Sequence, residues 1–159
     1  MGIQKLTTNN DLIFLDTSGW ISLLNSDDRG HSSAVRAWRE VILWGKRIVL
    51  TGWIIAETGN GLARSPRRAA FVESIRLLPS SPEFNVVPIV ADIFVRSVDL
   101  HAARPDKGWG LVDCASFVVM SDLGILDAFT TDRHFEQAGF RRLLPDPDRR
   151  DGESGETTP

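Results

Sequence analysis

Short apolar runs alternate along this chain with segments whose apolar residues recur at helical spacing, and this alternation strongly constrains the fold. Runs typical of buried strands occur at residues 13–15, 48–51, 84–89, 128–131 and 140–144. The segments between them are long enough for one or two helices each. Strands that alternate with helices favour a parallel sheet covered on both faces. The sequence therefore predicts an α/β fold with three layers, α/β/α, and a central parallel sheet of about five strands.

Helical periodicity and capping signals place the helices between these strands. They are expected at residues 20–24, 53–62, 66–78, 92–103, 111–123 and 134–138, with a further helix that runs from Ser32 or Ser33 through Ile42. Gly59 and Gly61 weaken the helix at 53–62. Gly124 is a typical residue to end the helix at 111–123.

The 159 residues fit one domain, and charge separates that domain from its C-terminal end. Residues 145–159 contain five acidic and two basic side chains, which account for the whole net charge of −3. This segment is rich in Pro, Gly and Asp and has no apolar residue, a composition typical of disorder. We expect a single domain at residues 1–144 and an acidic disordered tail at 145–159.

The sequence favours a cytoplasmic protein that has no membrane span. Its apolar runs, such as 41–44 and 117–120, are far shorter than the ~18 residues that a membrane helix needs. The first eleven residues lack the apolar centre of a signal peptide. Cys114 is the only cysteine, so an intrachain disulfide and a thiolate zinc site are both excluded.

Four acidic residues follow or flank the predicted strands. Asp16 ends the first strand, Asp132 follows the fourth, Glu57 lies in the helix after the second, and Asp113 lies in the first turn of the helix at 111–123. The 19 residues from Asp113 to Asp132 allow a helix and a strand, which return the chain to the same edge of the sheet. Active sites of parallel sheets lie at the carboxyl ends of the strands. The four carboxylates are therefore predicted to converge there.

Such a cluster is tolerable when a cation neutralises it, because like charges at ~4–6 Å raise one another's pKa. Oxygen ligands favour Mg²⁺ or Mn²⁺ over zinc. Carboxylates with no nearby histidine or cysteine suit metal-dependent phosphodiester hydrolysis better than acyl transfer. Each acid also has a simpler interpretation as a turn former or helix cap. That interpretation explains one acid better than it explains all four.

The segments that carry these acids resemble the four motifs of PIN-domain nucleases. They are Leu-Asp-Thr-Ser at 15–18, Ile-Ala-Glu-Thr-Gly-Asn at 55–60, Leu-Val-Asp-Cys-Ala-Ser-Phe at 111–117 and Phe-Thr-Thr-Asp-Arg-His-Phe at 129–135. The resemblance covers about residues 12–144 and points to the VapC-type toxins of type II toxin–antitoxin pairs. It implies an endoribonuclease that uses Mg²⁺ or Mn²⁺, forms a homodimer, acts on RNA and is blocked by a small antitoxin protein. Asp16, Glu57, Asp113 and Asp132 would be both its catalytic residues and its metal ligands.

Other polar and aromatic residues are candidates for supporting roles. The hydroxyls of Thr17, Ser18 and Thr130 either hold the acids and metal waters or simply cap a helix and fill a strand. Candidates for RNA phosphate contacts are Arg64, Arg67, Arg68 and Arg133, with His134 beside them, although a solvated basic face is an alternative. Trp20, Trp53 and Trp109 either stack on bases or belong to the core.

A second hypothesis is that the protein is a catalytically silent PIN-like module that binds RNA or a protein partner. It is motivated by apolar segments around four tryptophans, Trp20, Trp38, Trp44 and Trp53, which exceed what a small core needs. Those surfaces would then serve a dimer or a partner helix. Metal titration discriminates between the two, because a silent module would bind RNA without taking up metal.

Overall fold

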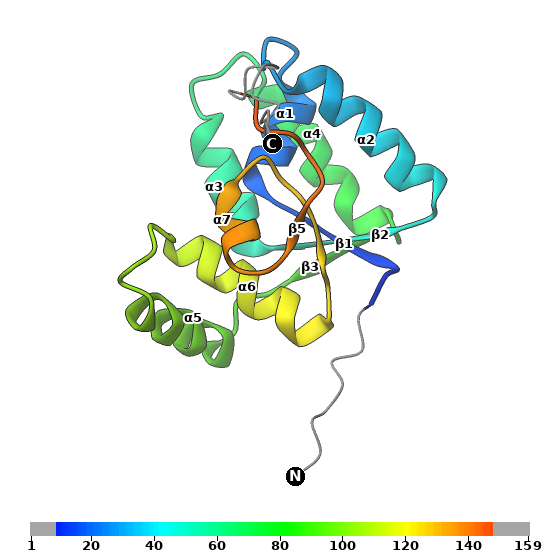
Figure 1. Cartoon of the computed structure of the whole chain (residues 1–159). Coiled ribbons are helices and arrows are strands. Elements are labelled where there is room, and N and C mark those ends of the chain that lie inside the picture. The colour runs from blue at the N-terminus through cyan, green and yellow to red at the C-terminus, as the bar shows by residue number, and fades with distance from the viewer. Residues whose placement is uncertain (1–8, 148–159) are drawn as a thin grey trace, which may run out of the picture.

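A computed structural model of the chain describes residues 9–147, and Figure 1 shows a layered α/β architecture. Five parallel strands form one sheet in the order β3-β2-β1-β4-β5. The strands are β1 Leu12–Leu15, β2 Arg47–Thr51, β3 Phe84–Val87, β4 Asp127–Phe129 and β5 Arg141–Arg142. The predicted three-layer fold with a parallel sheet of about five strands is confirmed.

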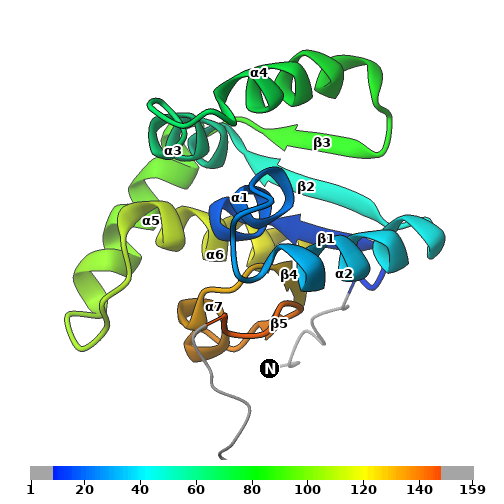
Figure 2. The same cartoon turned by 90° about the horizontal axis from the view of Figure 1, so that it is seen from above.

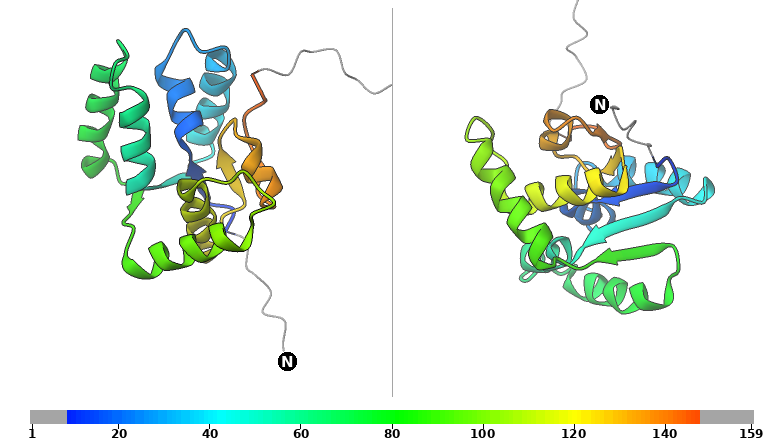
Figure 3. Two further views of the ribbon diagram at one scale, coloured as in Figure 1. Left: turned by 90° about the vertical axis from the view of Figure 1, so that its left-hand side faces the viewer. Right: turned by 90° about the horizontal axis from the view of Figure 1, so that it is seen from below.

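Helices cover both faces of this sheet (Figures 1 and 2). The helices are α1 Thr17–Leu24, α2 His31–Leu43, α3 Gly52–Gly61, α4 Arg68–Leu77, α5 Ala91–Ala103, α6 Leu111–Leu123 and α7 Arg133–Gln137, with a 3₁₀ turn at Leu78–Ser80. The first four lie on one face, while α5 and α6 cover the other with α7 beside α6 (Figure 3). None of these helices, within residues 9–147, is long and apolar enough to span a bilayer.

The central strand explains why the core forms where it does. All four residues of β1 are buried because helices cover both of its faces. On one face Phe14 packs against Phe135, with ring centroids 6.1 Å apart. On the other face Phe129 of β4 packs against Trp38 at 5.1 Å. Aromatic side chains on both faces therefore fix the position of β1 and β4, the strands that carry Asp16 and Asp132 at their ends.

A glycine allows α1 to begin directly beside the end of β4. A Cβ atom on Gly19 would lie 2.1 Å from the carbonyl oxygen of Phe129, far inside van der Waals contact. The first helix therefore approaches the strand more closely than any residue with a side chain permits. This close contact brings the segment after β1 against the segment after β4.

Several element boundaries differ from those predicted. The first helix begins at Thr17, three residues before the expected start at residue 20, because the Asp16 side chain caps it. Gly30, and not Ser32 or Ser33, is the N-cap of α2. The fourth helix begins at Arg68, after the predicted start at Pro66. The third strand ends before Pro88, which has no N–H to donate to a neighbouring strand.

The ends of the predicted domain can be compared in part. Gly124 has a positive φ of 65° and ends α6, as expected. Only residues 145–147 of the predicted acidic tail are described, and the remainder lies outside the described residues. The predicted division at residue 144 therefore stays a prediction.

Candidate active site

Asp16 follows β1 and is held by hydroxyl and amide groups. Its carboxylate is 6% exposed and accepts hydrogen bonds from Ser18 N at 3.2 Å and from Ser18 Oγ at 2.8 Å. The Thr130 hydroxyl donates a third bond at 2.8 Å. All three bonds end on Oδ2, so Oδ1 is the oxygen left with more capacity for another partner. The sequence left open whether these hydroxyls hold an acid or cap a helix. In the structure the Asp16 carboxylate caps α1, and the Ser18 and Thr130 hydroxyls hold that carboxylate.

Thr130 connects the ends of two neighbouring strands. Its side chain is fully buried at the end of β4, and its Oγ1 accepts a hydrogen bond from Asp132 N at 2.9 Å. Because the same oxygen donates to Asp16, one hydroxyl sets the position of both acid-bearing segments. Ser18 Oγ adds a second connection, since it accepts from Thr131 N at 3.0 Å.

Asp113, Asp132 and His134 form a direct cluster at the N-terminal ends of α6 and α7. Asp113 Oδ2 accepts the backbone N–H of Gly110 at 2.8 Å, and Asp132 Oδ1 accepts that of His134 at 2.8 Å. His134 Nδ1 lies 3.1 Å from Asp113 Oδ2 and 3.4 Å from Asp132 Oδ2. One possible ligand atom from each residue lies within 4.8 Å of the others. The third and fourth acids therefore face each other, as their spacing predicted.

Glu57 joins this region less directly. It is exposed on α3, and its Oε2 accepts a hydrogen bond from Thr17 Oγ1 at 2.5 Å. Thr17 is adjacent to Asp16, so Glu57 lies one hydroxyl group away from the first acid's segment. Among the described residues, no hydrogen bond or ion pair links Glu57 directly to Asp113 or Asp132.

Burial raises the pKa of two carboxylates of this site, Asp16 and Asp113. It raises the pKa of Asp16 to about 6, although hydrogen bonds from Ser18 and Thr130 oppose that rise. The pKa of Asp113 is also raised, first by burial and further by the charge of Asp132, against the stabilising contacts from Gly110 and His134. A divalent cation bound here would offset both the burial of these carboxylates and their mutual repulsion, because its positive charge stabilises their ionised forms. The donor set therefore fits the metal that the motifs imply.

His134 corrects one premise of the sequence interpretation. The acids were expected to have no histidine nearby, yet its imidazole contacts both Asp113 and Asp132. The contact with Asp132 follows from the short separation between the two residues at the start of α7. The contact with Asp113 spans 21 residues and depends on how α6 and α7 pack. The only signal in the sequence was the position of His134 two residues after an N-cap aspartate.

The predicted phosphate-binding arginines are not equivalent. Arg64, Arg68 and Arg133 are exposed, so they remain candidates. Arg67 instead binds the α1–α2 loop, where its Nη2 donates to Ser26 Oγ at 2.5 Å and lies 3.4 Å from an Asp27 carboxylate oxygen. This contact gives Arg67 a structural task that its position in the sequence did not reveal.

The tryptophans proposed to stack on bases belong mainly to the interior. Trp20 and Trp109 are each 5% exposed, and they pack on Phe71 and Phe117 respectively. Trp53 is half-buried and contacts Phe94 edge to face. The core interpretation therefore fits Trp20 and Trp109 better than base stacking does.

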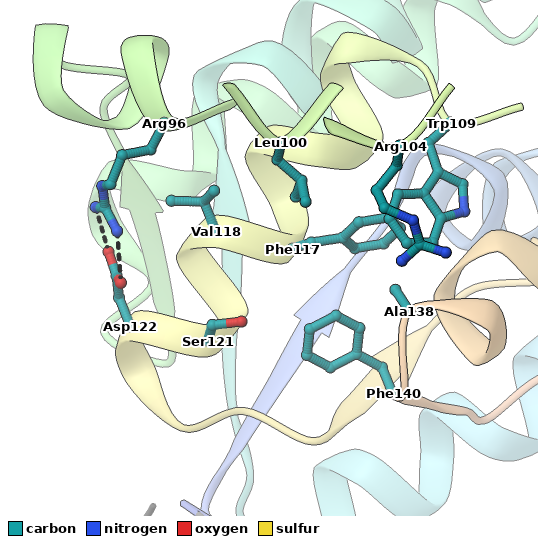
Figure 4. Close-up of a pocket in the computed structure, with 10 residues that line it drawn as sticks. All are labelled: Arg96, Leu100, Arg104, Trp109, Phe117, Val118, Ser121, Asp122, Ala138 and Phe140. Carbon is teal, nitrogen blue, oxygen red and sulfur yellow. Dashed lines mark hydrogen bonds and ion pairs between the residues drawn. The ribbon is translucent and has the colours of Figure 1, made fainter. Parts of the chain in front are cut away.

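A cleft of about 300 Å³ lies beside α5, α6 and α7, and Figure 4 shows its lining. Its Arg96 is paired with Asp122 at 2.6 Å. Its Arg104 pairs with Asp106 and stacks over the Trp109 ring at 4.9 Å. The arginines of this cleft are therefore neutralised, and none of the four predicted acids lines it. This cleft therefore shares no lining residue with the cluster of Asp113, Asp132 and His134.

Comparison with known proteins agrees with this geometry. The PIN domain family model matches residues 13–141, so the chain belongs to the PIN domain family. Among the relatives of the chain is the 23S rRNA-specific endonuclease VapC20, from two strains of Mycobacterium tuberculosis. Each is 29% identical to this chain over 138 residues, which cover 85% of this chain and all of the relative. The predicted PIN-domain ribonuclease of the VapC type is thereby confirmed.

A solved structure leads to the same assignment. The crystal structure of Mycobacterium tuberculosis VapC20, described as a sarcin-ricin loop cleaving toxin, superposes with a TM-score of 0.74. It is 28% identical and covers 84% of this chain and 99% of the solved chain. The five-stranded parallel sheet is thus accompanied by similarity over nearly the whole of a VapC toxin.

Proposed function

We propose that this protein is a metal-dependent endoribonuclease that hydrolyses RNA phosphodiester bonds as the toxin of a toxin–antitoxin pair. The observation that carries the proposal is the cluster in which His134 contacts both Asp113 and Asp132. The Thr130 hydroxyl links Asp132 in turn to Asp16. These three carboxylates, with Glu57 beside them, would hold Mg²⁺ or Mn²⁺. The bound ion would supply charge neutralisation and a more acidic water for attack on phosphorus.

The residues of the chain have separable tasks in this reaction. Thr130 and Ser18 orient the Asp16 carboxylate through hydrogen bonds that end on one oxygen. The Gly110 and His134 amides orient Asp113 and Asp132 in the same way. The exposed Arg64, Arg68 and Arg133 are proposed to bind RNA phosphates, which dominate nucleic-acid affinity. Because residues 1–144 carry no net charge, we expect these contacts to be local rather than part of a broad basic groove.

The relatives narrow the substrate. The VapC20 proteins are named for 23S rRNA, and the solved structure's description names the sarcin-ricin loop. We therefore propose a structured ribosomal RNA loop as the substrate class of this chain. We also propose a cytoplasmic location, since that is where such an RNA is found.

The decisive experiment compares wild type with Asp113→Asn in cleavage of ribosomal RNA. The asparagine oxygen can still accept the Gly110 amide, so the helix start is preserved while the charge is lost. We expect cleavage with Mn²⁺ or Mg²⁺ to fall about a hundredfold, within the range for loss of a positioned catalytic group. Asp99→Asn, an exposed substitution on α5, is the matched control. Equal activity of wild type and Asp113→Asn would reject the proposal.

Partners are also proposed. Four apolar residues at the start of α5 and along it are 39–54% exposed and support a homodimer. They are the N-cap Val90 and, within the helix, Phe94, Val95 and Val98. A small antitoxin protein is expected to block the acidic site. Light scattering at the elution peak of a sizing column measures the oligomeric state, and a monomer at micromolar concentration would contradict the dimer.

The alternative of a silent partner-binding module has one observation in its favour. Ile42, Leu43 and Trp44 at the end of α2 are 50%, 83% and 62% exposed, an apolar tip of the kind that protein partners cover. Binding of RNA by wild type without metal uptake in a calorimetric titration would support this alternative over the enzyme.

A further inference from the structure

We propose that His134 is a ligand of the divalent ion, so that the site has a mixed nitrogen and oxygen donor set and prefers Mn²⁺ to Mg²⁺. This inference rests on the proposed metal-dependent function and deepens it. The motifs place only carboxylates in the site, and they do not assign a role to the residue two positions after the fourth acid.

The direction of the imidazole is the first argument. His134 Nδ1 points between the two carboxylates, 3.1 Å from Asp113 Oδ2 and 3.4 Å from Asp132 Oδ2. One atom of each residue lies within 4.8 Å of the others, which is the separation of atoms that share a small cation. His134 Nε2 lies on the other side of the ring, towards Gly108. The nitrogen with the correct orientation for an ion is therefore Nδ1.

The backbone bonds of the cluster are the second argument. Asp132 uses Oδ1 to accept the His134 amide, and the Oδ2 oxygen faces the ring. Asp113 is held by the Gly110 amide. Because these bonds come from the first turns of α6 and α7, the carboxylates keep their positions whether or not the imidazole is present. The three side chains are 18–34% exposed, which leaves solvent access for an ion and its waters.

Ligand chemistry gives the metal preference. Mg²⁺ is a hard cation that binds oxygen and retains water, whereas imidazole nitrogen suits transition ions. A neutral imidazole binds metal through one nitrogen while the other carries the proton. In the metal-bound protein Nδ1 would therefore coordinate and Nε2 would hold the proton. Loss of the ring should weaken Mn²⁺ binding more than Mg²⁺ binding.

The direct test is pulsed electron paramagnetic resonance of the full chain loaded with one equivalent of Mn²⁺. Wild type should show modulation from a directly bound ¹⁴N nucleus, and His134→Gln should lose it. His101→Gln is the matched control, since His101 is exposed on α5 and bonds to the Trp109 carbonyl oxygen. Modulation that persists in a folded His134→Gln protein would overturn the proposal.

A measurement without substitution covers the case in which His134→Gln fails to fold. Wild type labelled with ¹⁵N-histidine should show the ¹⁵N pattern in place of the ¹⁴N pattern. Of the three histidines in the sequence, His134 is the one that contacts the acids. Unchanged modulation on labelling would refute histidine ligation.

Affinity supplies an independent readout. Calorimetric titration of metal-free protein should show that His134→Gln weakens Mn²⁺ binding about tenfold or more, in the range seen when groups around a metal are removed. Mg²⁺ binding should change much less. A parallel loss for both ions would contradict the proposed preference. If wild type binds Mn²⁺ through nitrogen but cleaves no RNA, the proposed function fails while this inference stands. If it cleaves RNA and shows no nitrogen signal, only this inference fails.

Discussion

Replacing Asp16 by asparagine should stabilise the metal-free protein while it removes a proposed catalytic group. The carboxylate is 6% exposed, and burial raises its pKa to about 6 from an ordinary value of 3.8. Asparagine keeps the shape, is an equally good N-cap, and can place its oxygen where Ser18 and Thr130 donate. The substitution therefore removes the buried charge and leaves the hydrogen bonds in place.

The sign and size of the effect follow from linkage between protonation and folding. Below pH 3.8 the carboxyl is protonated in both the folded and the unfolded chain, so the variant gains nothing. As pH rises towards 6, the unfolded chain ionises first and wild type loses stability. Each unit by which the pKa in the folded chain exceeds that in the unfolded chain is worth about 1.4 kcal/mol. The variant should therefore be more stable than wild type by about 3 kcal/mol above pH 6.

Urea denaturation of both proteins in the presence of a chelator, from pH 4 to pH 8, measures this difference in unfolding free energy. Asp99→Asn is the control, because an exposed carboxylate should give almost no change. Addition of Mn²⁺ at a hundredfold excess over its dissociation constant should raise the unfolding free energy of wild type by about 2.7 kcal/mol and that of the variant by less. Equal stability at pH 7.5, or a difference that does not vary with pH, would refute the reasoning.

Three further substitutions test the scaffold that holds the acids. Thr130→Val removes a buried hydrogen bond to a charged group and should lower the unfolding free energy by about 1.5–3 kcal/mol. It should also lower kcat for RNA cleavage while KM changes less, and unchanged kinetics would contradict its role. Gly19→Ala forces a Cβ to 2.1 Å from a backbone oxygen and should cost about 1–3 kcal/mol in a urea titration, whereas Gly52→Ala, in open space, should cost much less. Phe135→Ala removes a fully buried ring and should cost about 3–5 kcal/mol by the same assay; a loss below 1 kcal/mol would contradict its packing role.

The fold and the strand-end acids were predictable because their signals are local. The apolar runs of β1, β2 and β4 are short and sharply bounded, and parallel strands must present their carboxyl ends at one edge. Asp16 and Asp132 follow such runs, and Thr130 can link them because β1 and β4 are neighbours in the sheet. The position of Asp113 opposite Asp132 was predictable because α6 ends at Gly124 and β4 then returns the chain to that edge.

Contacts between distant side chains were not predictable in the same way. The ion pair of Arg67 with Asp27 joins α4 to a loop 40 residues earlier, and no periodicity encodes it. The bond between His134 and Asp113 likewise depends on how α6 and α7 pack. The start of α2 was misplaced because two serines offered caps, while the structure uses the glycine before them.

The position of the acids at helix starts has an electrostatic consequence. Asp16 caps α1, and Asp113 lies in the first turn of α6. Peptide dipoles give a helix start a partial positive charge of about half an elementary charge, which favours anions there. The backbone itself thus offsets part of the negative charge that the side chains gather, and a polyanionic strand would meet a weaker repulsion than a count of carboxylates suggests.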